Sequence, residues 1–121
     1  MRDFEFSFKA LDNFSNSLPY SNPSSIEALL IDELNELKTK YNFPAIHNNI
    51  GSYIKFSIND WKPKNIFEMG SGYGHSAFWY LSSNCSSIEK IFLTEKRSDL
   101  WESFENLSWP KEWKSKLDYY Q

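Results

Sequence analysis

The sequence predicts an α/β fold in which a parallel sheet follows two N-terminal helices. Apolar residues fall at helical spacing in the first half of the chain, whereas short apolar runs alternate with helical segments in the second half. A glycine-rich turn separates the first of these runs from its helix. Strands that alternate with helices through short links are parallel, so we expect half of an open, doubly wound sheet. The length of 121 residues suits one domain or part of one.

Composition and charge exclude several classes of protein. Apolar residues make up 40% of the chain and charged residues 24%, which is typical of a folded globular chain. The net charge of -3 predicts no basic surface for nucleic acid or for an anionic membrane, and no apolar run is long enough to span a bilayer. Cys85 is the single cysteine and no Cys/His cluster has zinc spacing, so we expect no metal site and a reducing, cytoplasmic setting.

Two helices are predicted ahead of the sheet, after an irregular arm over residues 1–23. The first covers 24–43, because Ser24 and Glu27 have the spacing of a capping box and an apolar stripe follows. The second covers 47–60. The predicted inner faces consist of Ile26, Leu29, Leu30, Leu34, Leu37 and Tyr41 in the first helix and Ile50, Tyr53, Ile54 and Ile58 in the second.

The remaining elements alternate along the chain, and together with the two helices they form one predicted domain over 24–121. The apolar run at 65–69 stops at glycine, which is typical of a buried strand. The further elements are strands at 88–94 and 116–121 and helices at 75–81 and 98–107.

The turn after the first strand is the segment most informative about function. It reads Glu68-Met69-Gly70-Ser71-Gly72-Tyr73-Gly74. Glycine lets the backbone turn sharply and approach a ligand, and free N–H groups at the start of the next helix can face an anion. A dinucleotide fingerprint would need glycine at position 75, which is His75, and a P-loop would need G-K-[ST]. The order acid-x-G-x-G-x-G instead resembles that of S-adenosylmethionine (SAM) methyltransferases.

Glu95 follows the second strand, twenty-one residues after Gly74. An acid at this point can accept both hydroxyls of a ribose. NAD sites use a similar acid, so the glycine spacing, and not Glu95, favours SAM over a dinucleotide. Two residues near the turn have other interpretations: Glu68 as a capping or ion-pairing residue, and His75 as a solvated side chain.

The stretch from Ile50 to Glu95 resembles SAM-dependent O-methyltransferases of the catechol and caffeoyl-CoA type. The matching pieces are Gly51-Ser52-Tyr53-Ile54, Lys62-Pro63-Lys64-Asn65-Ile66-Phe67-Glu68-Met69-Gly70, Gly74-His75-Ser76-Ala77 and Phe92-Leu93-Thr94-Glu95. That branch often has Tyr where this chain has His75. The resemblance implies a Rossmann-like fold of the class I methyltransferase type.

The resemblance also implies a cofactor site for SAM. Ser76 would bind the carboxylate of its methionine part, Glu68 would help to hold the amino group, and Glu95 would bind the ribose. Ile46 falls where the family has a residue that packs on the cofactor. The residues implied to line the methionine part are Gly70, Ser71, Gly72 and Gly74.

The family continues past the third strand with a turn beside the adenine and a fourth strand that carries the metal-binding acid and catalytic machinery. This sequence ends at Gln121, so we expect a partial fold, truncated after the third strand. No catalytic base can be named and no metal ligand is assigned. In the family's fold strand 65–69 is central; here its edge would be unpaired, so we expect it to pair in a homodimer or with a complementary chain.

The first functional hypothesis is therefore a SAM-dependent methyltransferase that acts on the oxygen of a small-molecule acceptor, with only its cofactor-binding half present. A second is a non-catalytic SAM-binding protein, or a remnant that needs a partner chain. A third is a dinucleotide-binding domain.

Overall fold

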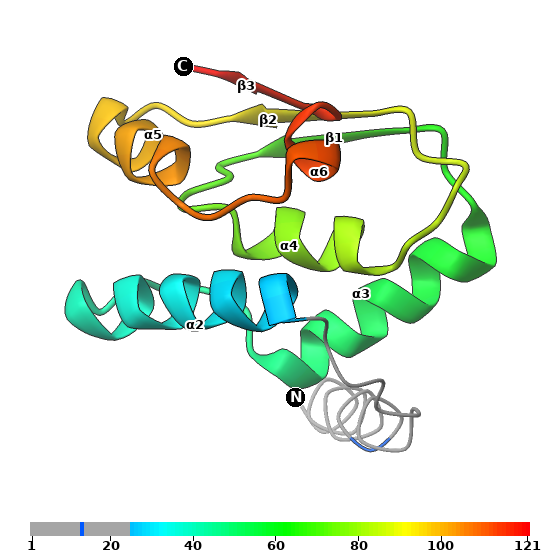
Figure 1. Cartoon of the computed structure of the whole chain (residues 1–121), viewed down its shortest axis with the longest axis horizontal. Helices are drawn as coiled ribbons and strands as arrows, with labels where there is room; N and C mark the ends of the chain where they lie inside the picture. The colour runs from blue at the N-terminus through cyan, green and yellow to red at the C-terminus, as the bar shows by residue number, and fades with distance from the viewer. Residues whose placement is uncertain (1–12, 14–24) are drawn as a thin grey trace, which may run out of the picture.

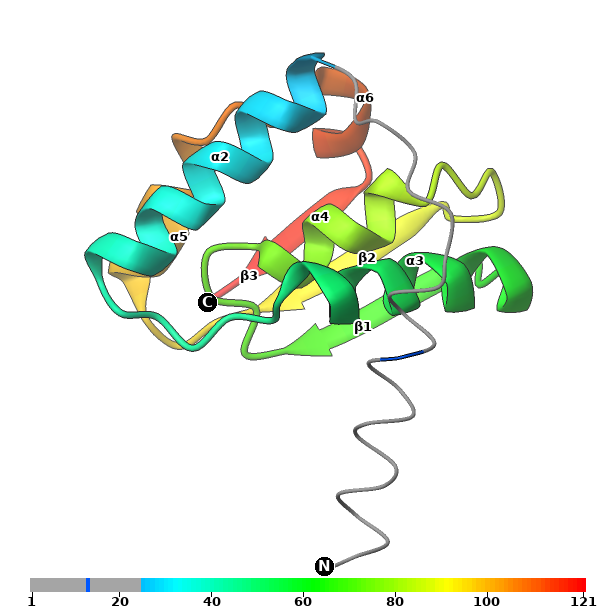
Figure 2. The same ribbon diagram turned by 90° about the horizontal axis from the view of Figure 1, so that it is seen from below.

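The computed structural model describes Asn13 and residues 25–121. The predicted arm over 1–23, apart from Asn13, and the Ser24 cap lie outside the described residues. Figure 1 shows a sheet with helix α4 beneath it and helices α2 and α3 beneath α4. Seen from below, α2 and α3 lie in front of α4, which runs along the strands (Figure 2). The site is therefore built on a sheet that is backed by two layers of helix.

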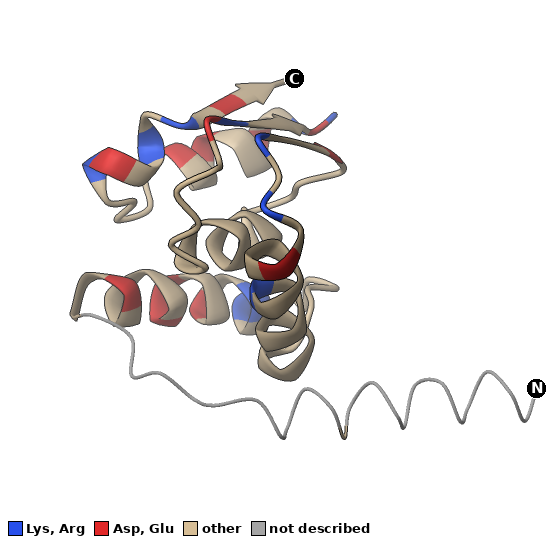
Figure 3. Ribbon diagram, turned by 90° about the vertical axis from the view of Figure 1, so that its right-hand side faces the viewer, with Lys and Arg blue, Asp and Glu red and all other residues tan. Residues whose placement is uncertain are grey.

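Helix α2 spans Ser25–Lys40 and buries Leu30 and Leu34 fully. Ile26 and Leu29, which the sequence placed on the same inner face, are about half exposed. The buried stripe is narrower than predicted because, among the described elements, α2 packs mainly on α4. Acidic residues recur along α2, and lysines lie near its C-terminal end, where they complement the helix dipole (Figure 3).

Helix α3 spans Asn48–Trp61 and packs against α4. Gly51 makes this contact possible, because a Cβ at that position would overlap the indole of Trp79. Ile58, which the sequence assigned to the inner face, is buried, and Ile54 packs against the core. The helix ends at Lys62 in the left-handed conformation, and the Lys62 N–H bonds the Ile58 carbonyl at 2.9 Å.

The sheet contains three parallel strands in the order β1-β2-β3, close to the three predicted runs. The second strand begins two residues later than predicted because the Ile88 N–H closes a turn onto the Cys85 carbonyl. The strands are β1 at Asn65–Met69, β2 at Lys90–Thr94 and β3 at Leu117–Tyr120.

The connections between strands are helical. Helix α4 spans His75–Ser82, and helix α5 spans Ser98–Glu105, which ends before residue 107 because the Leu107 N–H turns back onto the Phe104 carbonyl. A short helix, α6 at Lys111–Lys114, was not predicted; it begins directly after Pro110. No described helix combines the length and the apolar character that a membrane span requires.

The two faces of the sheet differ. The face toward α4 is the core, where Ile91 and Leu93 of β2 are fully buried. On the opposite face Phe67 is 65% exposed and Met69 81% exposed, and Figure 1 shows no described helix on that side. The prediction of a buried first strand is therefore wrong for this face. Strand β1 also forms one edge of the described sheet.

Candidate functional site

The turn between β1 and α4 requires glycine. Gly70, Gly72 and Gly74 have φ of 74°, 57° and 100°, in the left-handed region that side chains rarely adopt. A Cβ at Gly72 would overlap the ring of Phe43. Gly70 differs, because a Cβ there would meet no atom within 4 Å. The backbone at Gly70 therefore faces open space that a ligand could enter.

Hydrogen bonds tie this turn to the carboxyl ends of the neighbouring strands. The Ser71 N–H donates to the Thr94 carbonyl at 2.8 Å, and the Thr94 hydroxyl donates to the Glu68 carbonyl at 2.9 Å. The Tyr119 hydroxyl, on β3, donates to the Gly72 carbonyl at 2.8 Å. All three strands thus meet at the glycine turn, which is where ligands bind in open α/β sheets.

Glu95 also contacts the turn. Its Oε2 accepts the Gly72 N–H at 2.9 Å, and its Oε1 accepts the N–H groups of Lys96 and Arg97 at 2.9 and 3.3 Å. A carboxylate offers about four lone-pair sites, so acceptor capacity remains for a ligand hydroxyl. The residue predicted to bind a ribose therefore also holds the turn.

Two buried polar atoms at the end of β1 have no hydrogen-bond partner among the described residues: Glu68 Oε1 and Ser71 Oγ. The other carboxylate oxygen of Glu68, Oε2, accepts the Tyr80 hydroxyl at 2.8 Å. Burial raises the pKa of Tyr80, and the charge of Glu68 raises it further, so Tyr80 remains a donor. Glu68 thus neither caps a helix nor forms an ion pair within the described part of the chain. Unpaired buried polar atoms are rare, so Oε1 and Oγ have hydrogen-bonding capacity that the described residues do not use.

His75 is buried, so its interpretation as a solvated side chain is wrong. Its Nε2–H donates to the Leu34 carbonyl of α2 at 2.9 Å, while Nδ1 is buried without a partner in the described structure. Burial lowers the pKa of His75, and the charge of Lys38 lowers it further. The ring of Phe43 lies nearly parallel to the imidazole, with ring centroids 6.1 Å apart. His75 therefore anchors α4 to α2.

The segment that joins α2 to α3 lies beside the glycine turn (Figure 2). Phe43 is the residue of this segment that reaches Gly72, and it contacts Tyr73 edge-to-face with ring centroids 4.8 Å apart. Ile46, predicted to pack on a cofactor, lies three residues further along and is half-buried. The aromatic rings of Phe43 and Tyr73 therefore lie on one side of the turn.

The structure brings most of the predicted site residues to one place. Ser76 lies in the first turn of α4, beside the Tyr80 hydroxyl. Sequence reasoning missed Phe43, Tyr80 and Tyr119; the tyrosine pair at 119–120 could have signalled that one hydroxyl faces inward. No group of three or more His, Cys, Asp or Glu side chains in the described residues could hold a metal ion. The predicted residues joined to the turn by position or hydrogen bonds are Glu68, Gly70, Ser71, Gly72, Gly74, Ser76 and Glu95.

No protein-family model and no curated protein sequence matches the chain. Its fold is similar to that of a Podospora anserina methyltransferase, PaMTH1, in a crystal structure with SAH bound. The TM-score is 0.68 at 18% identity, and the match covers 97% of this chain and 50% of the other. The predicted partial Rossmann-like, methyltransferase-type fold is therefore confirmed, and this chain spans about half the length of that structure.

Proposed function

We propose that this chain is the cofactor-binding part of a SAM-dependent methyltransferase. The observation that carries the proposal is that two buried polar atoms flanking Gly70 in the chain, Glu68 Oε1 and Ser71 Oγ, have no partner among the described residues, while the backbone at Gly70 itself faces open space. A ligand with a donor-rich cationic group would satisfy both acceptors. The ammonium of SAM is such a group.

The charge of the site supports SAM over a dinucleotide. Glu68 lies near the carboxyl end of β1, next to the glycine turn. SAM brings an ammonium, which a carboxylate attracts, whereas a dinucleotide brings a pyrophosphate, which the same carboxylate repels. Glu95 does not separate the two ligands, because an acid at its position can bind the ribose of either. The position of His75, where the dinucleotide fingerprint needs glycine, agrees with this choice.

The residues around the turn fit each part of SAM. Glu68 Oε1 and Ser71 Oγ would accept the ammonium protons, and Ser76 with the first N–H groups of α4 would hold the carboxylate. Glu95 would accept a ribose hydroxyl at the lone-pair site that the three backbone N–H groups leave free. Ile46 would cover the cofactor from the α2–α3 segment.

When bound, SAM supplies a methyl group activated by its sulfonium, which passes to a nucleophile and leaves S-adenosylhomocysteine (SAH). The protein contributes position, since holding two reactants in line supplies much of the acceleration of such a transfer. By resemblance, the acceptor is an oxygen of a small molecule. A screen of small hydroxyl, amine and carbon acceptors with isotope-labelled SAM tests this part of the proposal, and transfer to nitrogen or carbon acceptors alone would contradict it.

A second candidate function is SAM binding without turnover, or turnover only with a partner chain. It is favoured because the chain aligns with only half of the PaMTH1 chain. Binding of SAM without transfer of labelled methyl to any acceptor would favour this second candidate over the first.

Calorimetric titration of the full chain with SAM, SAH and NAD tests the shared premise. We expect SAM and SAH to bind and NAD not to bind. Glu95→Ala should weaken SAH binding about tenfold to a hundredfold, because a hydrogen bond to a charged group contributes about 1.5–3 kcal/mol. Glu102→Ala, an exposed acid on α5, is the matched control and should bind normally. Preferential binding of NAD would overturn the proposal.

A further inference from the structure

We infer that Tyr119 is a positioning residue for the cofactor, because its hydroxyl fixes the Gly72 peptide from the β3 side. This inference rests on the proposed function. The Tyr119 hydroxyl donates to the Gly72 carbonyl at 2.8 Å, across 47 positions of sequence. On its other side, the Gly72 N–H donates to Glu95 Oε2 at 2.9 Å. Tyr119 of β3 and Glu95, which directly follows β2, therefore hold the two backbone polar groups of Gly72.

The Gly72 carbonyl belongs to the same planar peptide as the Tyr73 N–H. Fixing the carbonyl therefore also fixes the direction of that N–H, which lies in the turn ahead of α4. Glycine has the widest backbone freedom of any residue, and Gly72 has a φ of 57°. In the ligand-free chain a side-chain bond at this point reduces that freedom and keeps the turn in one shape.

Tyr119 is itself held in place. It pairs with Leu93 in the β2–β3 register, and its ring packs on Phe104 with centroids 4.7 Å apart. Burial raises the pKa of Tyr119, and the charges of Glu95 and Glu68 raise it further, so the hydroxyl keeps its proton and remains a donor. A rigid donor aimed at the turn is what positioning requires.

Removing the hydroxyl oxygen of Tyr119 tests whether this side chain positions the turn. Tyr119→Phe keeps the ring that packs on Phe104 and deletes only the donor to Gly72. Tyr120→Phe is the matched control: it is the adjacent residue, it lies on the opposite face of the sheet, and it is 54% exposed. Both variants lose the same atom from the same strand.

Two measurements compare these variants with the unaltered chain. In the ligand-free protein, NMR hydrogen exchange at the Gly72 and Tyr73 amides should be several-fold faster in Tyr119→Phe and unchanged in Tyr120→Phe. In calorimetry, SAH should bind roughly two- to tenfold more weakly to Tyr119→Phe, the range for one neutral hydrogen bond, and normally to Tyr120→Phe. Thermal unfolding verifies that both variants are folded.

The outcomes separate this inference from the proposed function. If the unaltered chain binds SAH and Tyr119→Phe binds it equally well, the inference is overturned while the proposed function stands. If the unaltered chain binds neither SAM nor SAH, the proposed function fails and the inference fails with it. A Tyr119→Phe chain that does not fold would also overturn the inference, since the role would then be structural.

Discussion

The carboxylate of Glu33 on α2 accepts both hydrogen bonds that Ser108 donates. The Ser108 N–H bonds Oε2 at 2.8 Å and the hydroxyl bonds Oε1 at 2.6 Å, across 75 positions of sequence. The next residue, Trp109, packs on Phe104 and covers Gly74. The two hydrogen bonds thereby join helix α2 to the segment at Ser108 and Trp109, which packs against the glycine turn.

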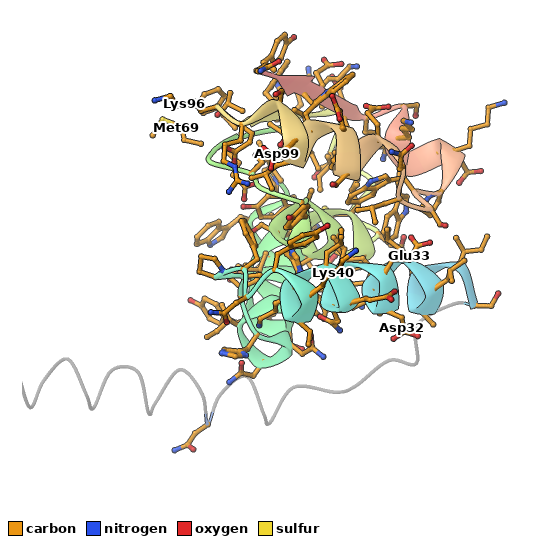
Figure 4. All side chains as sticks on the ribbon, turned by 90° about the vertical axis from the view of Figure 1, so that its left-hand side faces the viewer. Asp32, Glu33, Lys40, Met69, Lys96 and Asp99 are labelled. Carbon is orange, nitrogen blue, oxygen red and sulfur yellow. The ribbon has the colours of Figure 1, made fainter. Side chains whose placement is uncertain are left out.

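Replacing Glu33 should destabilise the fold. Glu33→Ala leaves the half-buried N–H and hydroxyl of Ser108 without their acceptor, so we expect the free energy of unfolding to fall by about 1–3 kcal/mol in urea denaturation. Asp32→Ala is the matched control, because Asp32 is exposed on the opposite side of α2 (Figure 4). The control should change stability by less than about 0.5 kcal/mol. Equal losses in both variants would mean that the Glu33–Ser108 bonds add nothing to stability.

Two glycine substitutions should separate backbone strain from steric overlap. Gly70→Ala forces a side chain into the left-handed region without any clash, so it should lower the free energy of unfolding by about 1–2 kcal/mol. Gly72→Ala adds an overlap with the Phe43 ring to the same strain and should cost more. Chemical denaturation of both variants measures the difference. A Gly72→Ala variant as stable as Gly70→Ala would show that Phe43 moves aside freely.

The helices and strands could be predicted because each has a recognisable local pattern of residues in the sequence. Apolar runs mark the strands, and three closely spaced glycines mark a turn with positive φ, so the amino-acid order by itself locates the turn from Gly70 to Gly74. Because β1 and β2 are parallel and adjacent, their carboxyl ends meet at one edge of the sheet. The relation of Glu95 to the turn could therefore be expected from the chain alone.

Long-range contacts could not be predicted. The sequence does not tell which of Tyr119 and Tyr120 faces the core, because that depends on the register of β3 with β2. It also does not reveal that His75 bonds a carbonyl of α2, 41 positions away. The exposure of Phe67 was missed for a similar reason: an apolar strand residue is expected to be covered, and no described element covers this one.

His75 should make stability depend on pH. Its pKa in the folded chain lies below the ordinary value of 6.5, because burial disfavours the charged form. The unfolded chain therefore takes up a proton that the folded chain does not, as pH falls through about 6.5. The free energy of unfolding is thus highest above this pH and decreases between it and the lowered pKa.

The test compares urea unfolding at pH 7.5 and at pH 5.5. His75→Gln keeps a donor for the Leu34 carbonyl but does not titrate, so its loss of stability on acidification should be smaller than that of the unaltered chain. His47→Gln, at the other and exposed histidine, is the control and should retain the contribution of His75. An unchanged pH dependence in His75→Gln would refute this role.

Tyr80→Phe should affect both stability and ligand binding. The variant leaves Glu68 Oε2 as a second buried acceptor without its donor, so the free energy of unfolding should fall by about 1–3 kcal/mol. Under the proposed function, SAH binding should weaken as well, because Tyr80 orients the Glu68 carboxylate. Tyr41→Phe, at an exposed tyrosine, is the control for denaturation and calorimetry. If SAH binds Tyr80→Phe normally, Glu68 does not depend on Tyr80 for its position.

The position of β1 at the edge of the described sheet leads to a prediction about assembly. We propose that β1 pairs with β1 of a second copy, since an edge strand presents unpaired N–H and carbonyl groups. Antiparallel pairing centred on Phe67 would bring two exposed aromatic rings opposite each other, an arrangement that stabilises paired strands. A second copy would thereby cover apolar surface that no described element covers.

Sedimentation of the purified chain tests this proposal. We expect a species of twice the 14.3 kDa monomer, in a concentration-dependent equilibrium. Phe67→Lys should shift the equilibrium to monomer, because like charges opposite each other repel and lysine on an edge opposes pairing. Trp61→Lys, at an exposed aromatic residue that ends α3 outside the strand, is the control and should still dimerise. A monodisperse monomer at all concentrations would exclude self-pairing and leave the edge free for a different chain.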